Sequence, residues 1–215
     1  VTTFSFTETN NTVFNNSVDV ETQESLADAI ANAQEGDVIT VSKDINALPA
    51  IDKKITLFCE EGTVFESVKS FNLNGSTVIG ASFKNEEGTV VASGINGIFK
   101  DCNFEGNNAM RYAYAGENMV FENCYFKENG GEWVFHIDGK SSGVTESNII
   151  FKNCTFDGKR VAIGGAVTSV RLENCKFVNG SYFNSYSKTD CIGCDFNTSI
   201  RPLDKLHTYT NCTYK

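Results

Sequence analysis

Apolar residues recur along this chain in one short pattern: an apolar residue, a polar one, Asn, Cys, another polar residue and Phe. The clearest copies span 121–126, 151–156 and 172–177. Looser copies span 78–83, 99–104, 191–196 and 209–214, and the copy at 78–83 has Ala in place of Cys. Neighbouring copies mostly begin about 20 residues apart, and a repeat in this range is typical of a solenoid.

The pattern also predicts the local backbone. Phe121 and Cys124 lie three residues apart, so a flat strand would point them to opposite sides. Both can be buried only if the chain bends at Asn123. Asn, Asp or Gly occupies this position in every copy, and these residues tolerate the left-handed conformation that such a bend uses. Each copy is therefore predicted to be two short strands joined by a one-residue corner.

A different period appears near the N-terminus. Leu26, Ala29, Ile30 and Ala33 follow helical spacing, so residues 24–34 are predicted to form a short helix that ends before Gly36. We expect this helix to cap the first coil. Residues 1–20 are predicted to be an extended arm and residues 21–215 one solenoid domain with coils of about 22 residues. In the coil at 54–65 the register stays open, because Phe58 stands where the pattern has Asn.

A third strand is predicted after each copy, at 89–92, 110–114, 132–137, 160–163, 181–186 and 200–203. Pro202 cannot donate to a central ladder, so the last of these is expected at an edge or distorted. No closing helix follows the last copy. Because bare strand edges promote association, we expect another chain, or the arm at 1–14 of a neighbour, to cover that end.

This arrangement resembles the right-handed parallel β-helix proteins of the pectate-lyase-like superfold. It is similar in particular to the repeat modules of surface and virion proteins, whose coils have an x-x-N-C-x-F pattern. The resemblance covers residues 22–215 and implies an all-β solenoid with a short N-terminal capping α-helix. The fold serves lyases, hydrolases, adhesins and phage spikes alike, so it does not fix a function.

Composition narrows the choice of partners. The net charge of −9 argues against nucleic acid, which requires a basic stripe, and against an anionic membrane surface. The sequence has no apolar run long enough to insert in a membrane. Seventeen Phe predict a stacked aromatic column in the core.

The eight Cys allow two interpretations. Six of them share one place in the repeat, which favours a buried ladder of reduced thiols, since Cys is a small buried hydrophobe. Stacked coils are also close enough for disulfides, although side chains pointing the same way suit that geometry poorly. The Cys191–Cys194 pair has the spacing of a redox or zinc motif but lacks the surrounding pattern.

Candidate chemistry lies on the third strands, which differ most between coils. Stacking would set their aromatic and charged residues side by side, as a sugar-binding surface needs. The predicted ligand-binding residues are Arg111, Tyr112, Tyr114, Trp133, Asp138, Lys140, Tyr182 and Tyr186. Each Tyr, and Trp133, could instead pack in the core. The polar loop at 138–147 lies in the longest coil and is a second candidate for binding.

Three residues are candidates for catalysis. His136 and Asp138 share one side of a strand and could exchange protons, and Arg160 follows on the next coil. A structural histidine is the favoured interpretation of His136, because the motif contains no third partner. The catalytic motifs of the hydrolases with this fold are missing, and the acidic residues do not reach the density that calcium requires. The sequence thus predicts no metal and no cofactor.

Together these features favour a non-catalytic structural or binding module. It would belong to a virion, as a phage decoration or fibre protein, or to a bacterial cell surface, as an adhesin. Its partners would be glycans or other subunits, in a homo-oligomer or docked to a larger particle, and its location extracellular. The alternative is a small polysaccharide lyase or glycoside hydrolase.

Overall fold

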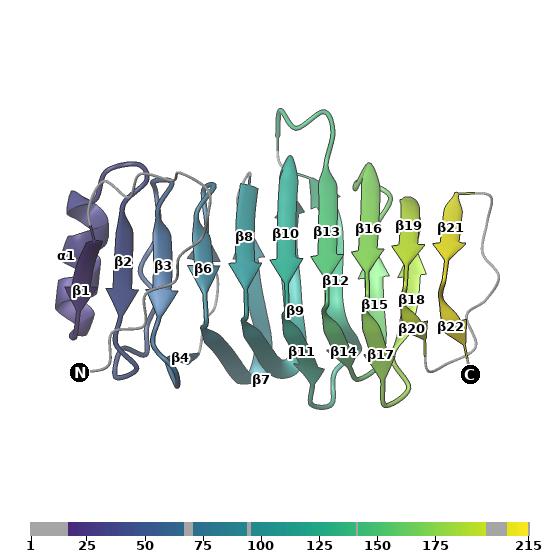
Figure 1. Ribbon diagram of the computed structural model, residues 1–215, viewed down its shortest axis with the longest axis horizontal. Coiled ribbons are helices and arrows are strands. Elements are labelled where there is room, and N and C mark those ends of the chain that lie inside the picture. The colour runs from purple at the N-terminus through teal and green to yellow at the C-terminus, as the bar shows by residue number, and fades with distance from the viewer. Residues whose placement is uncertain (1–16, 67–70, 94–95, 141, 197–205, 215) are drawn as a thin grey trace.

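A computed structural model of the protein describes residues 17–66, 71–93, 96–140, 142–196 and 206–214. These residues form a right-handed parallel β-helix with one short helix, as the repeat predicts (Figure 1). Three faces run along the solenoid. The first face is a single sheet of parallel strands, one for each turn. Its strands are β1 (Ser17–Val20), β2 (Val38–Val41), β3 (Thr56–Cys59), β6 (Thr77–Ile79), β8 (Asn96–Lys100), β10 (Asn118–Glu122), β13 (Asn148–Lys152), β16 (Ser169–Glu173), β19 (Lys188–Ile192) and β21 (His207–Thr210).

The other two faces belong to one sheet. The second face holds β4 (Val64–Glu66), β11 (Tyr125–Glu128), β14 (Thr155–Asp157), β17 (Lys176–Val178), β20 (Asp195–Phe196) and β22 (Thr213–Tyr214). The third face holds β5 (Phe71–Asn72), β12 (Trp133–Lys140), β15 (Arg160–Ile163) and β18 (Tyr182–Ser185). Two long strands, β7 (Ser82–Ser93) and β9 (Asn103–Ala115), run through both faces and join them.

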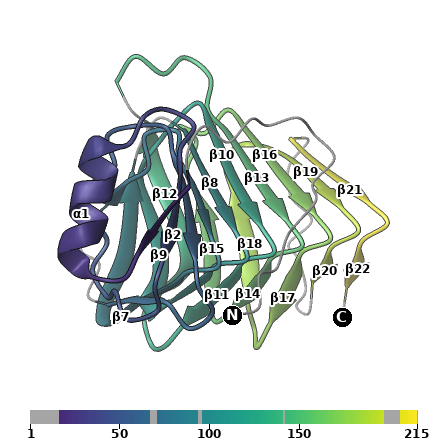
Figure 2. The same ribbon diagram turned by 60° about the vertical axis from the view of Figure 1, so that its left-hand side comes forward.

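The helix α1 (Gln23–Asn32) lies against one end of the solenoid beside β1, as both views show (Figure 1 and Figure 2). Thr22 caps it, because the Thr22 hydroxyl accepts a hydrogen bond from the Ser25 amide at 3.1 Å. Leu26 and Ile30 are buried against the first coil. The predicted capping helix is therefore present, within two residues of its expected bounds.

The corner predicted at the repeat has the expected left-handed backbone. Asn123, Asn153 and Asn174 have φ angles of 55°, 52° and 52°. Their side chains form a ladder, in which Asn153 Nδ2 donates to Asn123 Oδ1 at 3.0 Å and Asn174 Nδ2 donates to Asn153 Oδ1 at 3.4 Å. Because the chain bends here, the apolar residues on both sides of the corner point inward.

Replacing Asn153 tests the corner. Asn153→Val should lower the free energy of unfolding by about 1–3 kcal/mol, because a β-branched residue resists a positive φ. Asn153→Gly keeps the backbone and loses only exposed hydrogen bonds, so we expect a loss of about 1 kcal/mol or less. Urea unfolding followed by circular dichroism measures both. Equal losses would assign the role to the amide group.

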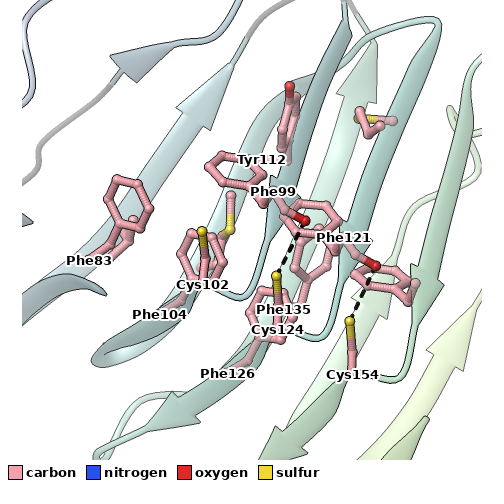
Figure 3. Close-up of a cluster of buried hydrophobic side chains, with 14 of the residues drawn as sticks. Phe83, Phe99, Cys102, Phe104, Tyr112, Phe121, Cys124, Phe126, Phe135 and Cys154 are labelled. Carbon is pink, nitrogen blue, oxygen red and sulfur yellow. Dashed lines mark hydrogen bonds between the residues drawn. The ribbon is translucent and has the colours of Figure 1, made fainter. Parts of the chain in front are cut away.

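Two stacked aromatic columns fill the core (Figure 3). Rings of the second-face column stack at centroid distances of 5.1, 5.0 and 5.2 Å, from Phe83 through Phe104 and Phe126 to Phe156. On the first face Phe121 stacks on Phe99 and Phe151, both at 5.2 Å. Parallel pairing sets identical residues of successive coils opposite one another, so a repeated Phe becomes a column.

Six of the cysteines form the predicted ladder, and all eight are free thiols. Cys124 Sγ donates to the Phe99 carbonyl at 3.6 Å and Cys154 Sγ to the Phe121 carbonyl at 3.4 Å, each on the preceding coil (Figure 3). Burial raises the pKa of the Cys124, Cys154 and Cys175 thiols well above the ordinary value. These thiols therefore stay protonated near neutral pH.

A thiol reagent should report this burial directly. We expect the native protein to react slowly, starting at Cys212, which is only half-buried. After unfolding without reductant, all eight thiols should react. If fewer than half of them reacted, disulfides would replace the ladder.

The structure also locates the parts that the sequence left open. Residues 17–20 were assigned to the arm, and they form β1, which pairs in parallel with β2. In the irregular coil, Leu57 aligns with Val78 and Phe58 with Ile79, so Phe58 precedes the corner and is 38% exposed. The alternating residues at 4–6 and the strand expected at 200–203 lie outside the described residues.

Candidate functional site

A strip of aromatic and cationic side chains crosses the middle of the third face. Four residues from neighbouring turns form its frame: Arg111 on β9, His136 on β12, Arg160 on β15 and Tyr182 on β18. His136 pairs in register with Arg111, and Arg160 with Tyr182. Adjacent turns of a parallel sheet are about 4.8 Å apart, so Arg111 and His136 are neighbours in one column. Trp133, Arg160 and Tyr182 form a second column beside it, because Trp133 lies opposite Arg160 and His136 lies opposite Ala162.

Trp133 and His136 share β12 and both lie on the outside. This is possible because the strand shifts register between Trp133 and Phe135, which buries Val134 and Phe135 in succession. The two outer rings then stack at a centroid distance of 4.4 Å and an angle of 10°. The bulge thus places a stacked, partly exposed pair of rings on the outside of an otherwise regular strand.

Arg160 extends this surface onto the next turn. Its guanidinium carbon lies 5.9 Å from the centre of the Trp133 ring, and Nη2 lies 3.9 Å from the Glu132 carboxylate. An exposed ion pair at this distance contributes little to stability. Trp133 Nε1 and Arg160 Nε are buried and have no hydrogen-bond partner among the described residues. These two N–H groups of the strip therefore donate no hydrogen bond within the described part of the chain.

Asn108 fixes the start of β12. Its Oδ1 accepts hydrogen bonds from the backbone amides of Glu132 at 2.7 Å and Trp133 at 3.0 Å. This contact holds the strand just before the bulge. A role for Asn108 or Glu132 could not be predicted from the sequence, because neither residue is part of the repeated pattern. Asn108 lies within the long strand β9, and Glu132 lies in the bend before β12.

Tyr112 does not belong to the strip, and its prediction as a ligand-binding residue is wrong. Its side chain is fully buried, because it alternates with Arg111 along β9 and points inward beside Met110. Burial raises the pKa of its hydroxyl. Tyr112 therefore serves the core, and Arg111 alone represents this part of β9 on the surface.

Three other predicted residues lie on the surface at different places. Tyr182 adjoins Arg160 and is 44% exposed. Tyr186 is 73% exposed but follows the end of β18, four residues further along that turn. Lys140 is exposed at the far end of β12, where Nζ donates to the Thr145 carbonyl at 3.4 Å. Only Tyr182 joins the strip.

The remaining predicted residues, Tyr114 and Asp138, lie in β9 and β12, and their side chains are outside the described part of the structure. The polar loop after β12 projects beyond the neighbouring turns (Figure 1 and Figure 2). A cavity of about 560 Å³ lies at the capped end between α1 and β1, and no predicted site residue lines it.

The side chains of the strip are of the kinds that bind acidic sugars. Aromatic faces pack against the apolar C–H faces of sugar rings, and a guanidinium pairs with a carboxylate through two parallel hydrogen bonds. Within the described ranges, no three His, Cys, Asp or Glu side chains gather in a way that could hold a metal ion. No described helix is long and apolar enough to span a membrane.

Comparison with known proteins identifies the fold. No family model matches the chain, and no curated protein matches it in sequence. A solved structure does match, with a TM-score of 0.56 and 15% sequence identity: that of the PL6 family alginate lyase AlyGC. The likeness supports the parallel β-helix fold. The match covers 93% of this chain and 37% of that chain, so this chain spans little more than a third of the lyase.

Proposed function

We propose that this chain is a non-catalytic module that binds acidic polysaccharides on its third face. The observation that carries the proposal is the strip of Arg111, Trp133, His136, Arg160 and Tyr182. An extended sugar chain lying along the solenoid would cross several turns. Its rings would pack on the Trp133 and Tyr182 side chains, and its carboxylates would pair with Arg111 and Arg160.

The charge distribution supports a local site rather than a general attraction. The net charge of −9 repels polyanions at long range, although physiological salt screens this repulsion beyond about 8 Å. Binding must then depend on the two arginines of the strip at close range. Such a module fits a place outside the cell, on a cell surface or a virion, where acidic polysaccharides occur.

A second candidate is a polysaccharide lyase, which the likeness to an alginate lyase favours. In that case Arg160 and His136 would act on the substrate as charge neutraliser and proton acceptor. The ring of His136 lies flat against Trp133, and this arrangement suits a binding platform. The binding module therefore remains the first proposal.

One experiment separates the two. The protein is titrated by calorimetry with a soluble polyuronate and with an uncharged glucan of similar length. The same mixtures are then assayed for new reducing ends and for the ultraviolet absorbance of unsaturated uronates. Binding of the polyuronate without products supports the module. Products would establish the lyase, and the absence of both binding and products would reject both functions.

A further inference from the structure

The first face carries a column of alternating charges on four successive turns. Lys100, Glu122, Lys152 and Glu173 lie opposite one another in register on β8, β10, β13 and β16. All four side chains are partly exposed, and Lys100 Nζ lies 3.8 Å from Glu122. Within one chain, this alternation gives each inner charge opposite charges as neighbours.

A second column runs beside the charges on the same outer surface. It holds the half-buried apolar side chains of Ile98, Val120 and Ile150, followed by Arg171. A third column is polar and holds Asn96, Asn118, Asn148 and Ser169 in register. The Asn118 backbone amide donates a hydrogen bond to Asn96 Oδ1 at 2.8 Å. Among the residues that the structure describes, none lies over β8, β10, β13 or β16 (Figure 1).

The four charges alternate in sign along the solenoid, so the column read in the reverse direction has the opposite charge at every position. A two-fold axis parallel to the strands, midway between β10 and β13, would turn a second copy face to face with the first and reverse its turns. Lys100 would then face Glu173 of the other copy, and Glu122 would face Lys152. Val120 would meet Ile150 across the axis, so the apolar column would pair with itself at its centre, while Ile98 would meet Arg171.

We propose that this face is a docking surface for a second copy of the chain, which binds by such an isologous contact. The complementary charges favour the arrangement in which the two solenoid axes run in opposite directions. If the axes ran in the same direction, each charge would face a like charge of the other copy. The third faces of both copies would stay on the outside. This consequence rests on the proposed function: a dimer would carry two polysaccharide-binding strips, which raises avidity for any polymer long enough to reach both.

The test is a charge exchange measured by sedimentation velocity over a range of protein concentrations. The wild type should form a dimer of twice the 23.5 kDa chain. Glu122→Lys alone opposes two lysines at both symmetric contacts, and Lys152→Glu alone opposes two glutamates. Each should weaken dimerisation at least about tenfold, since like charges in an interface are costly. The double variant restores both contacts, so its dimer constant should return to within about threefold of the wild type.

Lys176→Glu on the second face serves as the matched control and should leave the dimer constant unchanged. Circular dichroism verifies that every variant is folded. Rescue by the double variant supports the docking surface, because the exchange worsens the charge pattern within each chain. A wild type that is monomeric at all concentrations, single variants that stay dimeric, or a folded double variant that stays monomeric would overturn it.

Discussion

Phe126→Ala should lower the free energy of unfolding by about 3–5 kcal/mol, the range for a large aromatic side chain removed from a packed core. The Phe126 ring is fully buried and stacks between Phe104 and Phe156 at 5.0 and 5.2 Å. It also meets Phe121 and Phe135 edge to face. Truncation would leave a cavity in the middle of the column, and neighbouring turns cannot close it without breaking their pairing.

Phe58→Ala provides the control, because this ring is 38% exposed on the outside of β3. We expect a loss of less than about 1 kcal/mol there. Urea unfolding followed by circular dichroism measures both variants. If the two losses were similar, the stacked columns would not be the main source of stability, and the account of the repeat would need revision.

Arg160→Ala should weaken the binding of a polyuronate by about tenfold to a hundredfold, as expected for the loss of hydrogen bonds to a charged group. Arg160→Lys should recover only part of the affinity, because an ammonium group cannot form two parallel bonds to a carboxylate or cover the Trp133 ring. Stability should change little in either variant, since the ion pair with Glu132 is exposed. Calorimetric titration gives the affinities.

Lys176→Ala is the matched control for charge, because Lys176 is exposed on the second face. Its affinity should stay within about twofold of the wild type. A loss equal to that of Arg160→Ala would mean that the polysaccharide responds only to net charge. The strip would then have no special role.

The fold could be predicted from the sequence because one repeated pattern encodes it. Asn123, and the Asn, Asp or Gly at the same place in other coils, adopts a left-handed corner. Because of this corner, the apolar residues before and after it both point inward. Parallel stacking then converts each repeated Phe and Cys into a column. The register of the irregular coil at Phe58 could not be predicted, because β3 continues through Cys59 and the positive φ of its turn comes only at Gly62.

The strip was predicted only in part, for physical reasons that single residues illustrate. Arg111 and Tyr112 are adjacent, so one of them had to point inward, but the pattern did not fix the parity of the long strand β9. Trp133 and His136 are three residues apart and would face opposite sides of a regular strand. Only the bulge at Val134 brings them together, and a bulge leaves no mark in the alternation of this short strand.

The fluorescence of Trp133 is the most direct probe of polysaccharide binding on the third face, since Trp133 is the only tryptophan in the chain and lies within the strip. Titration with a polyuronate should change its emission in a saturable way, with the same midpoint as the calorimetric titration. An uncharged glucan should leave the emission unchanged. If the polyuronate bound without altering the emission, or if both polymers gave the same response, binding would not involve the third face as proposed.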